Sequence, residues 1–331
     1  MFKESKIILP LSLLLSALFA LFEGGSYLFA FLPAALIFFL GISALHALWA
    51  WAGKPRALLF IIAVALLLRL ISSVALYVFL PTNGYPNSEQ QQAGYVFYDA
   101  FRRDTEAWDL AQSDHSLFNA FSKEYHTDQY GGLLAFSAGV YRYLSPDAHR
   151  SLLIALFSAF AAALGIPFFW LAAKNLGGEK LANTATWIFA LYPESILMGS
   201  SQMREPFLIS FVAIALWGLL RWHPPALSGI PPSSKKIGRK WGAAVAILSF
   251  LGMLLVSPAI AFISLIFFGI YALIQREESR FSPKLLALFA VLFLLSIFLL
   301  AAALGQTKID AGSPFGIIAK WGQRAVKWDI Y

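Results

Sequence analysis

The sequence predicts an all-α fold, a polytopic bundle of transmembrane helices. Hydrophobic residues make up 59% of the 331 residues and charged residues only 13%, which is about half the share found in soluble domains. Several apolar runs reach the roughly 20 residues that a helix needs to cross the hydrocarbon core of a bilayer. Cysteine is absent, which excludes disulfides and thiolate metal sites.

Each predicted span corresponds to one long apolar run. The first run, IILPLSLLLSALFALF, is interpreted as a span and not as a signal peptide. It lacks a clear small-x-small cleavage site, and a second apolar run follows at once. The nine predicted spans are 7–22, 27–51, 57–80, 150–173, 181–199, 206–222, 241–256, 259–275 and 285–304.

The distribution of Lys and Arg predicts the orientation of these spans. With the N-terminus in the cytoplasm, the basic residues fall in the cytoplasmic loops, as the positive-inside rule requires. The outer turns at 23–26 and 257–258 contain none, and basic loops explain the net charge of +7 without nucleic acid as a partner. We therefore expect a multi-pass plasma-membrane protein with segments 81–149 and 305–331 outside and a flexible cytoplasmic linker at 224–232. The cytoplasmic basic residues are Lys3, Lys6, Lys54, Arg56, Lys174, Lys180, Arg221, Lys235, Lys236, Arg239, Lys240, Arg276, Arg280 and Lys284.

The outer segment 97–111, FYDAFRRDTEAWDLA, carries many charges for a membrane protein. Drawn as a helix at about 100° per residue, it places Asp104 on an apolar face between Phe101 and Trp108. We expect this helix to lie on the membrane surface with its aromatic side inward. A carboxylate there is costly unless it is paired or functional. The alternative is that Asp104 is the N-cap of a second helix. The charged face holds Asp99, Arg102, Arg103, Glu106 and Asp109.

The turn between the fifth and sixth spans, within ALYPESILMGSSQMREPFLISF, carries a second group of charges at the outer surface. Glu194, Arg204 and Glu205 form either a local Arg–Glu pair or a second wall of a site that contains Asp104. Arg69, in LLLRL, lies near the middle of its span, too deep to reach the outer surface easily. It either pairs with a carboxylate or binds a ligand phosphate, and the sequence leaves both interpretations open.

Several short motifs occur in a recognisable order. A span with LLLRL leads to an outer loop with RRDTEAW, and DQYGGLLAFSAGVYRYLS and LYPESILMGSSQMREPF follow. This layout resembles the GT-C glycosyltransferases, the membrane class that includes protein O-mannosyltransferases, aminoarabinose transferases and oligosaccharyltransferases. The resemblance implies a seven-span module at 57–304 with the outer loop 81–149 after its first span. Two departures from that class are a two-span hairpin at 1–56 and an end at Tyr331 after an amphipathic outer tail, 305–331. A fragment, a degenerate copy and a subunit of a complex all stay open.

The resemblance also implies a donor, a mechanism and a set of site residues. The donor is a sugar on a polyprenyl phosphate, and the acceptor is a lipid, a glycan or a protein on the extracytoplasmic face. Asp104 acts as general base, with Glu106 and Glu205 as further catalytic acids, and the anomeric carbon is inverted. Guanidinium groups bind the phosphate. The binding residues are Arg204, Arg69, Arg103, Glu194, Gln129 and Tyr130.

Cofactors and two rival functions stay open. A divalent metal ion has candidate ligands in Asp104, Glu205, His126 and Asp128, which show no fixed metal-binding spacing. A lipid or solute transporter would place polar residues at mid-membrane and show an internal repeat. Here the charges cluster at the outer surface instead. The third candidate is a non-catalytic membrane subunit with a GT-C-like fold, which contacts membrane lipids and other membrane subunits.

Overall fold

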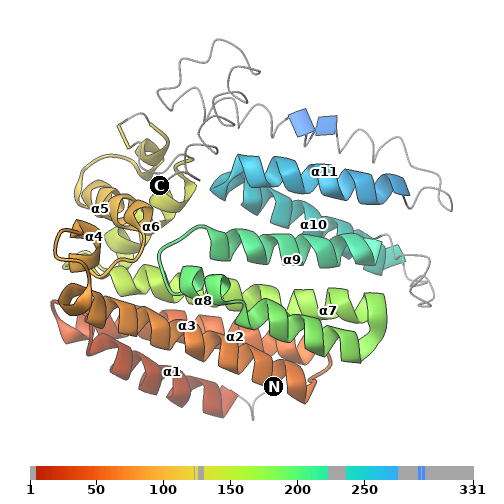
Figure 1. Ribbon diagram of the computed structural model, residues 1–331, viewed down its shortest axis with the longest axis horizontal. Helices are drawn as coiled ribbons and strands as arrows, with labels where there is room; N and C mark the ends of the chain where they lie inside the picture. Colours follow the sequence, from red (N-terminus) through yellow and green to blue (C-terminus); the bar gives the residue numbers. More distant parts are fainter. Residues whose placement is uncertain are drawn as a thin grey trace.

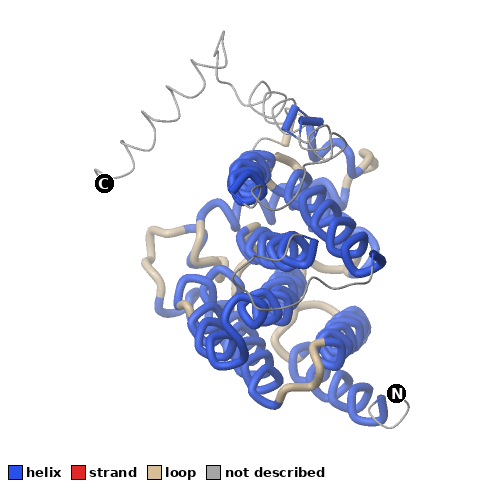
Figure 2. Tube along the Cα trace, turned by 90° about the vertical axis from the view of Figure 1, so that its right-hand side faces the viewer, coloured by secondary structure: helices blue, strands red, loops and turns tan. Residues whose placement is uncertain are grey.

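The chain forms a bundle of helices. The computed structural model describes residues 5–122, 124–125, 130–222, 236–274, 290–291 and 293–294, and this part of the chain contains no strand (Figure 1). The long helices run side by side, and the helices of the outer loop gather at one end of the bundle (Figure 1). Figure 2 likewise shows helices and connecting loops in the described part. The all-α prediction is confirmed for these residues.

Helices α1 (Ser5–Ala20), α2 (Tyr27–Trp51) and α3 (Arg56–Asn83) form one side of the bundle (Figure 1). The turn from α1 to α2 passes through Gly25, whose φ of 77° lies in the left-handed region that favours glycine. Large apolar side chains cover the outward faces of all three helices, a surface that suits lipid and not water. Exposed examples are Leu14, Leu18, Phe29, Leu36, Phe60 and Ile71.

Helix α7 (Ser151–Leu191) consists of two helical arms separated by a break at Gly177 and Gly178. Gly178 has a φ of 77°. Phe169 and Phe189 stack with their ring centroids 4.4 Å apart, whereas a straight helix would separate positions so far apart in sequence by about 30 Å. The arms therefore fold back on each other. They correspond to the predicted spans 150–173 and 181–199.

The second of these arms ends earlier than the sequence predicts. A residue before proline is pushed out of the helical region, and Tyr192 before Pro193 has a ψ of 119°. A separate short helix, α8 (Pro193–Gly199), therefore follows α7. The chain continues through α9 (Glu205–Trp222), α10 (Lys236–Val256) and α11 (Pro258–Ile274). The buried side chains that pack these last three helices together include Leu208, Phe250, Met253, Leu254 and Leu265.

The outer loop contains α4 (Glu89–Gln92), α5 (Tyr98–Gln112), the 3₁₀ helix η1 (Leu117–Phe121) and α6 (Gly132–Leu144). Trp108 of α5 meets Tyr141 of α6 edge-on, with ring centroids 5.7 Å apart. Gly131, with a φ of 74°, turns the chain into α6. A Cβ on Gly132 would overlap the carbonyl oxygen of Leu255 near the end of α10. These contacts fix the outer loop on the bundle.

Four described helices are long and apolar enough to cross a membrane, namely Tyr27–Trp51, Arg56–Asn83, Ser151–Leu191 and Glu205–Trp222. Shorter apolar helices accompany them at Ile7–Ala20, Lys240–Val256 and Pro258–Tyr271. These lengths and compositions fit a membrane protein. Nine spans are not shown, because most of the predicted span 285–304 lies outside the described residues, as do the linker 224–232 and the tail 305–331.

Candidate functional site

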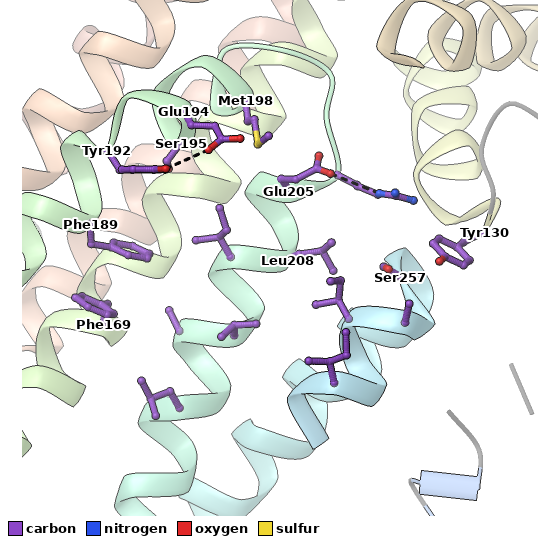
Figure 3. A pocket seen from close by; sticks show the side chains of 18 residues that line it. Tyr130, Phe169, Phe189, Tyr192, Glu194, Ser195, Met198, Glu205, Leu208 and Ser257 are labelled. Carbon is purple, nitrogen blue, oxygen red and sulfur yellow. Dashed lines mark hydrogen bonds and ion pairs between the residues drawn. The ribbon is translucent and has the colours of Figure 1, made fainter. Parts of the chain in front are cut away.

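A pocket of about 600 Å³ lies between α7, α8, α9 and α11 (Figure 3). Tyr130, which precedes α6, also borders this pocket. Acidic and other polar side chains gather at one end of it, and apolar side chains line the rest (Figure 3). The polar lining residues are Tyr130, Tyr192, Glu194, Ser195, Arg204, Glu205 and Ser257.

The charged end of the pocket is formed around the connection from α8 to α9. Arg204 Nε lies 3.6 Å from Glu205 Oε1, and the Arg204 guanidinium lies 5.3 Å from the ring centroid of Tyr130. The Tyr192 hydroxyl donates to Glu194 Oε2 at 3.2 Å. Glu205 Oε2 is buried and accepts no hydrogen bond from the described residues. A buried carboxylate oxygen usually has a donor, so this oxygen can accept a hydrogen bond from water or from a ligand in the pocket.

The body of the pocket is apolar. The stacked rings of Phe169 and Phe189 form part of one wall (Figure 3), and aliphatic side chains of α9 and α11 form others. An amphiphile with a charged head and a hydrocarbon tail matches this distribution of polar and apolar lining. The aliphatic lining residues are Leu208, Ile209, Val212, Ala213, Leu216, Ala259, Ile260 and Ile263.

Asp104 does not line this pocket and lies instead in a buried hydrogen-bond network. It is 2% exposed. Its Oδ2 accepts from the Tyr95 hydroxyl at 2.6 Å, and its Oδ1 accepts from the Tyr141 hydroxyl at 2.5 Å. His149 Nε2 lies 2.7 Å from Oδ2. Burial first, and then the charge of Asp104, raise the pKa of Tyr95 and Tyr141 well above 10.0, so both phenols stay protonated and donate.

His149 lies at the solvent side of this network. Its side chain is 30% exposed, whereas that of Asp104 is 1% exposed. The imidazole stacks on Trp108, with ring centroids 5.2 Å apart and 19° between the planes. It also meets the Tyr141 ring edge-on at 4.9 Å. A carboxylate and two aromatic rings therefore fix the orientation of this histidine.

Glu23, in the turn between α1 and α2, is a second acid near Asp104. Both of its carboxyl oxygens are buried. Burial raises the pKa of Glu23 from 4.5 to about 8, with a smaller upward contribution from Asp104 and an opposing one from Arg150. Near neutral pH this carboxyl is therefore mostly protonated. Glu23 and Asp104 therefore lie near each other, and the charge of Asp104 adds to the effect of burial on Glu23.

Helix α5 corrects two sequence-based expectations. It runs unbroken from Tyr98 to Gln112, so the interpretation of Asp104 as an N-cap is wrong. Asp104 does lie inside the protein, as its place on the apolar face predicts. The helical projection places Arg103 on the charged outer face, and this is also wrong. Arg103 is 5% exposed, and its Nη1 donates to the carbonyl of Gln202 at 3.1 Å.

The projection fails for Arg103 because α5 contacts the rest of the protein on two sides and not on one. The segment before α9 covers the side of α5 that carries Arg103, and a projection of one helix cannot reveal such a neighbour. Glu106, also on the projected charged face, is partly exposed and does not line the pocket. The structure therefore brings Glu194, Arg204, Glu205 and Tyr130 together and leaves Asp104, Arg103 and Glu106 outside that cavity.

Arg69 is buried and held by the protein itself. Its Nη1 donates to the carbonyls of Ala65 at 2.9 Å and Ala190 at 3.2 Å. Its Nη2 donates to Ser195 Oγ at 2.9 Å. A Cβ on Gly199 would lie 2.7 Å from the Arg69 Nε, so glycine allows α8 to approach. Ser195 lines the pocket and Arg69 does not, which favours a structural role in which Arg69 supports the pocket wall.

Gln202 connects the buried network with the charged end of the pocket. Its carbonyl accepts from Arg103, and its Nε2 donates to the carbonyl of Ser151 at 2.6 Å. Ser151 follows His149 by two residues, and Arg204 follows Gln202 by two residues. Each of these intervals spans at most about 7 Å of chain. The Asp104–His149 pair and the charged end of the pocket therefore flank one hydrogen-bonded junction.

The metal prediction stays a prediction. Among the described residues, no group of three or more His, Asp and Glu side chains is placed to hold a metal ion. His126, Asp128 and Gln129 lie outside the residues that the structure describes. Of the remaining candidate ligands, Glu205 lines the pocket and Asp104 lies in the buried network.

Sequence reasoning missed His149, Tyr95, Tyr141 and Glu23. His149 lies in YLSPDAHR, directly before a span, with no second histidine at a motif spacing. The one signal in the sequence is its position, because a residue between the outer loop and the next span lies at the same membrane surface as Asp104. That signal indicates only how deep in the membrane His149 lies, so it could not have predicted that His149 contacts Asp104.

No protein-family model, curated protein or solved structure matches this chain. The resemblance to the GT-C glycosyltransferases therefore depends on the predicted layout of the spans and on the short motifs alone. The geometry of the pocket and of the buried network must carry any functional argument.

Proposed function

We propose that this chain is an integral membrane glycosyltransferase that takes its sugar from a polyprenyl-phosphate donor at the extracytoplasmic face. The observation that supports it most is the pocket, which has charged side chains at one end and apolar side chains along the rest. A polyprenyl phosphate has the same two parts, an anionic head and an isoprenoid tail. Such a ligand enters from the bilayer and keeps its head at the membrane surface.

The charged end suggests how the head is bound. Arg204 supplies N–H donors for the phosphate, because a guanidinium matches two phosphate oxygens at once. Glu205 and Glu194 accept hydrogen bonds from sugar hydroxyls, and one Glu205 oxygen is buried without a donor among the described residues. The isoprenoid tail lies along Leu208, Val212 and neighbouring aliphatic side chains. The partner surface for the acceptor lies at the same outer end.

The proposed topology has nine spans and a cytoplasmic N-terminus. The end of α2, the start of α3, the α7 break and the end of α9 lie at one end of the bundle (Figure 1). Basic residues lie close to these points, among them Lys54, Arg56, Lys174, Lys180 and Arg221. The outer-loop helices lie at the opposite end. This asymmetry agrees with the positive-inside rule and supports a pocket whose charged end faces outward.

A binding experiment with a matched control tests the donor site. Wild-type protein in nanodiscs is titrated with a fluorescent polyprenyl phosphate and with the corresponding polyprenol. Arg204→Gln should weaken phosphate binding about 10-fold or more, because a hydrogen bond to a charged group contributes roughly 1.5–3 kcal/mol. Arg102→Gln is the control, because Arg102 is exposed on α5 over the Tyr98 ring and does not line the pocket. Equal binding of the two lipids, unchanged by Arg204→Gln, would contradict the proposal.

A transfer assay tests the reaction itself. The same nanodiscs receive polyprenyl-phosphate hexoses with labelled sugar and a membrane lipid extract as the acceptor source, and the label is followed from donor to product. Wild-type protein should transfer the label from at least one donor, and Glu205→Gln should reduce the rate. Binding of polyprenyl phosphate without any transfer would favour the second candidate, a non-catalytic subunit. The enclosure of Asp104 by Tyr95, Tyr141 and His149 is the observation that favours that candidate.

A further inference from the structure

We propose that His149 is the group that receives the proton of the acceptor, and that Asp104 is a positioning residue that orients it. This inference rests on the proposed transferase function. It differs from the sequence-based expectation, in which Asp104 itself is the base. Asp104 is 2% exposed and accepts from two phenols, so an acceptor hydroxyl has no direct access to it.

The hydrogen bonds assign the tautomer of His149. Tyr95 and Tyr141 donate to the Asp104 carboxylate, which therefore acts as an acceptor. Its third partner, His149 Nε2, is then an N–H donor to Oδ2 at 2.7 Å. In a neutral imidazole the other nitrogen carries a lone pair. Nδ1 thus is a proton acceptor, and among the described residues it forms no hydrogen bond.

The arrangement leaves the imidazole accessible and unable to turn. The side chain is 30% exposed, and the stacked Trp108 ring and the edge-on Tyr141 ring restrict its rotation. When a buried carboxylate holds an accessible histidine, the acid keeps the imidazole in the tautomer that can accept a proton. The acid also stabilises the imidazolium that then forms. The titratable and charged groups around the pair are Tyr95, Tyr141, Glu23 and Arg150, with Asp147 bound to Arg150.

The position of His149 also suits a reaction at the charged end of the pocket. Ser151, two residues after His149, accepts from Gln202, and Arg204 follows Gln202 by two residues. The base and the phosphate-binding guanidinium therefore flank the same junction. The proposal requires a sugar whose phosphate binds to Arg204 to present its anomeric carbon to an acceptor that contacts His149.

The step balances without a further reactant. The acceptor oxygen forms a bond to the anomeric carbon while the bond from that carbon to the phosphate oxygen breaks. The electron pair of the broken bond leaves on the lipid phosphate, and Arg204 stabilises the added negative charge. The acceptor proton moves to His149 Nδ1, and the resulting imidazolium is stabilised by Asp104. The anomeric configuration is inverted.

Steady-state kinetics of sugar transfer test the inference. His149→Gln should lower kcat by about 10²–10⁴-fold, the usual contribution of a positioned base, with little change in the affinity for polyprenyl phosphate. Wild-type kcat/KM should fall toward acid pH, and the residual activity of His149→Gln should lack this acid limb. Asp104→Asn should lower kcat and shift the pH range over which kcat/KM falls. His115→Gln is the matched control, because His115 is exposed in the loop after α5.

The outcomes separate the two proposals. Absence of transfer by wild-type protein with every donor overturns the transferase function and this inference with it. Wild-type transfer together with full activity and an unchanged acid limb in His149→Gln overturns this inference alone. If His149→Gln does not fold, carbethoxylation of the wild-type protein replaces it. The inference is supported if transfer is lost in proportion to the modification of His149 and if bound donor slows that modification. Full activity of the modified protein overturns it.

Discussion

Replacing Glu23 by glutamine should remove a loss of stability that this protein otherwise shows between about pH 5 and pH 8. Burial raises the pKa of Glu23 from 4.5 to about 8 in the folded state. Between these two values the folded state holds a proton that the unfolded state has released. The contribution of Glu23 is therefore fully present below the unfolded pKa and is lost as the pH rises toward 8. The slope is about 1.4 kcal/mol per pH unit, so the full window corresponds to roughly 5 kcal/mol.

The free energy of unfolding can be followed by SDS titration in mixed micelles at several values between about pH 5 and pH 9. Wild-type protein should lose stability steadily from about pH 5 to about pH 8 and should change little above that. Glu23→Gln should be much less sensitive, because the amide imitates the protonated carboxyl at every pH. The matched control is Glu179→Gln, since Glu179 is 57% exposed and pairs only with Lys174, at 3.6 Å, among the described residues. Parallel curves for wild-type protein and Glu23→Gln would refute the reasoning.

Three other substitutions give distinct expectations in the same titration. Tyr141→Phe should cost about 1.5–3 kcal/mol, because it removes a buried hydrogen bond to the Asp104 carboxylate, and unchanged stability would show that this bond is absent. Arg150→Ala should cost at least about 1.5–3 kcal/mol, since it removes the charged hydrogen bonds through which the buried guanidinium bridges the α1–α2 turn to the start of α7, and a loss below about 1 kcal/mol would contradict the bridge. Gly132→Ala should cost about 1–3 kcal/mol through overlap with the Leu255 carbonyl, and a neutral result would mean that α6 and α10 lie further apart.

The elements of the fold were largely predictable because hydrophobicity sets them locally. The runs that became α2, α3 and α9 needed only length and composition, and the break in α7 at Gly177 and Gly178 falls between the predicted spans 150–173 and 181–199. The boundary at Pro193 was missed, although the conformational restriction before proline is also local. Apolar residues continue on both sides of Pro193, and hydropathy does not distinguish one long span from a span followed by a short helix.

The candidate site was less predictable, because it depends on contacts between segments far apart in the sequence. The periodicity of α5 correctly turned Asp104 inward, yet it placed Arg103 outside, since it contains no information about Gln202. The pairing of Asp104 with His149 joins positions 45 residues apart. Periodicity therefore gives the face of a helix, and only tertiary structure gives the partner on that face.

Photolabelling tests the central claim, a polyprenyl-phosphate site in the pocket, most directly. A polyprenyl phosphate with a diazirine on its first isoprene unit is irradiated with the protein in nanodiscs, and the modified peptides are identified by mass spectrometry. Labels should concentrate on the pocket-lining parts of α9 and α11, and unlabelled polyprenyl phosphate should compete while polyprenol competes weakly. Equal labelling of the outward faces of α1 and α2, with no protection by polyprenyl phosphate, would contradict the account.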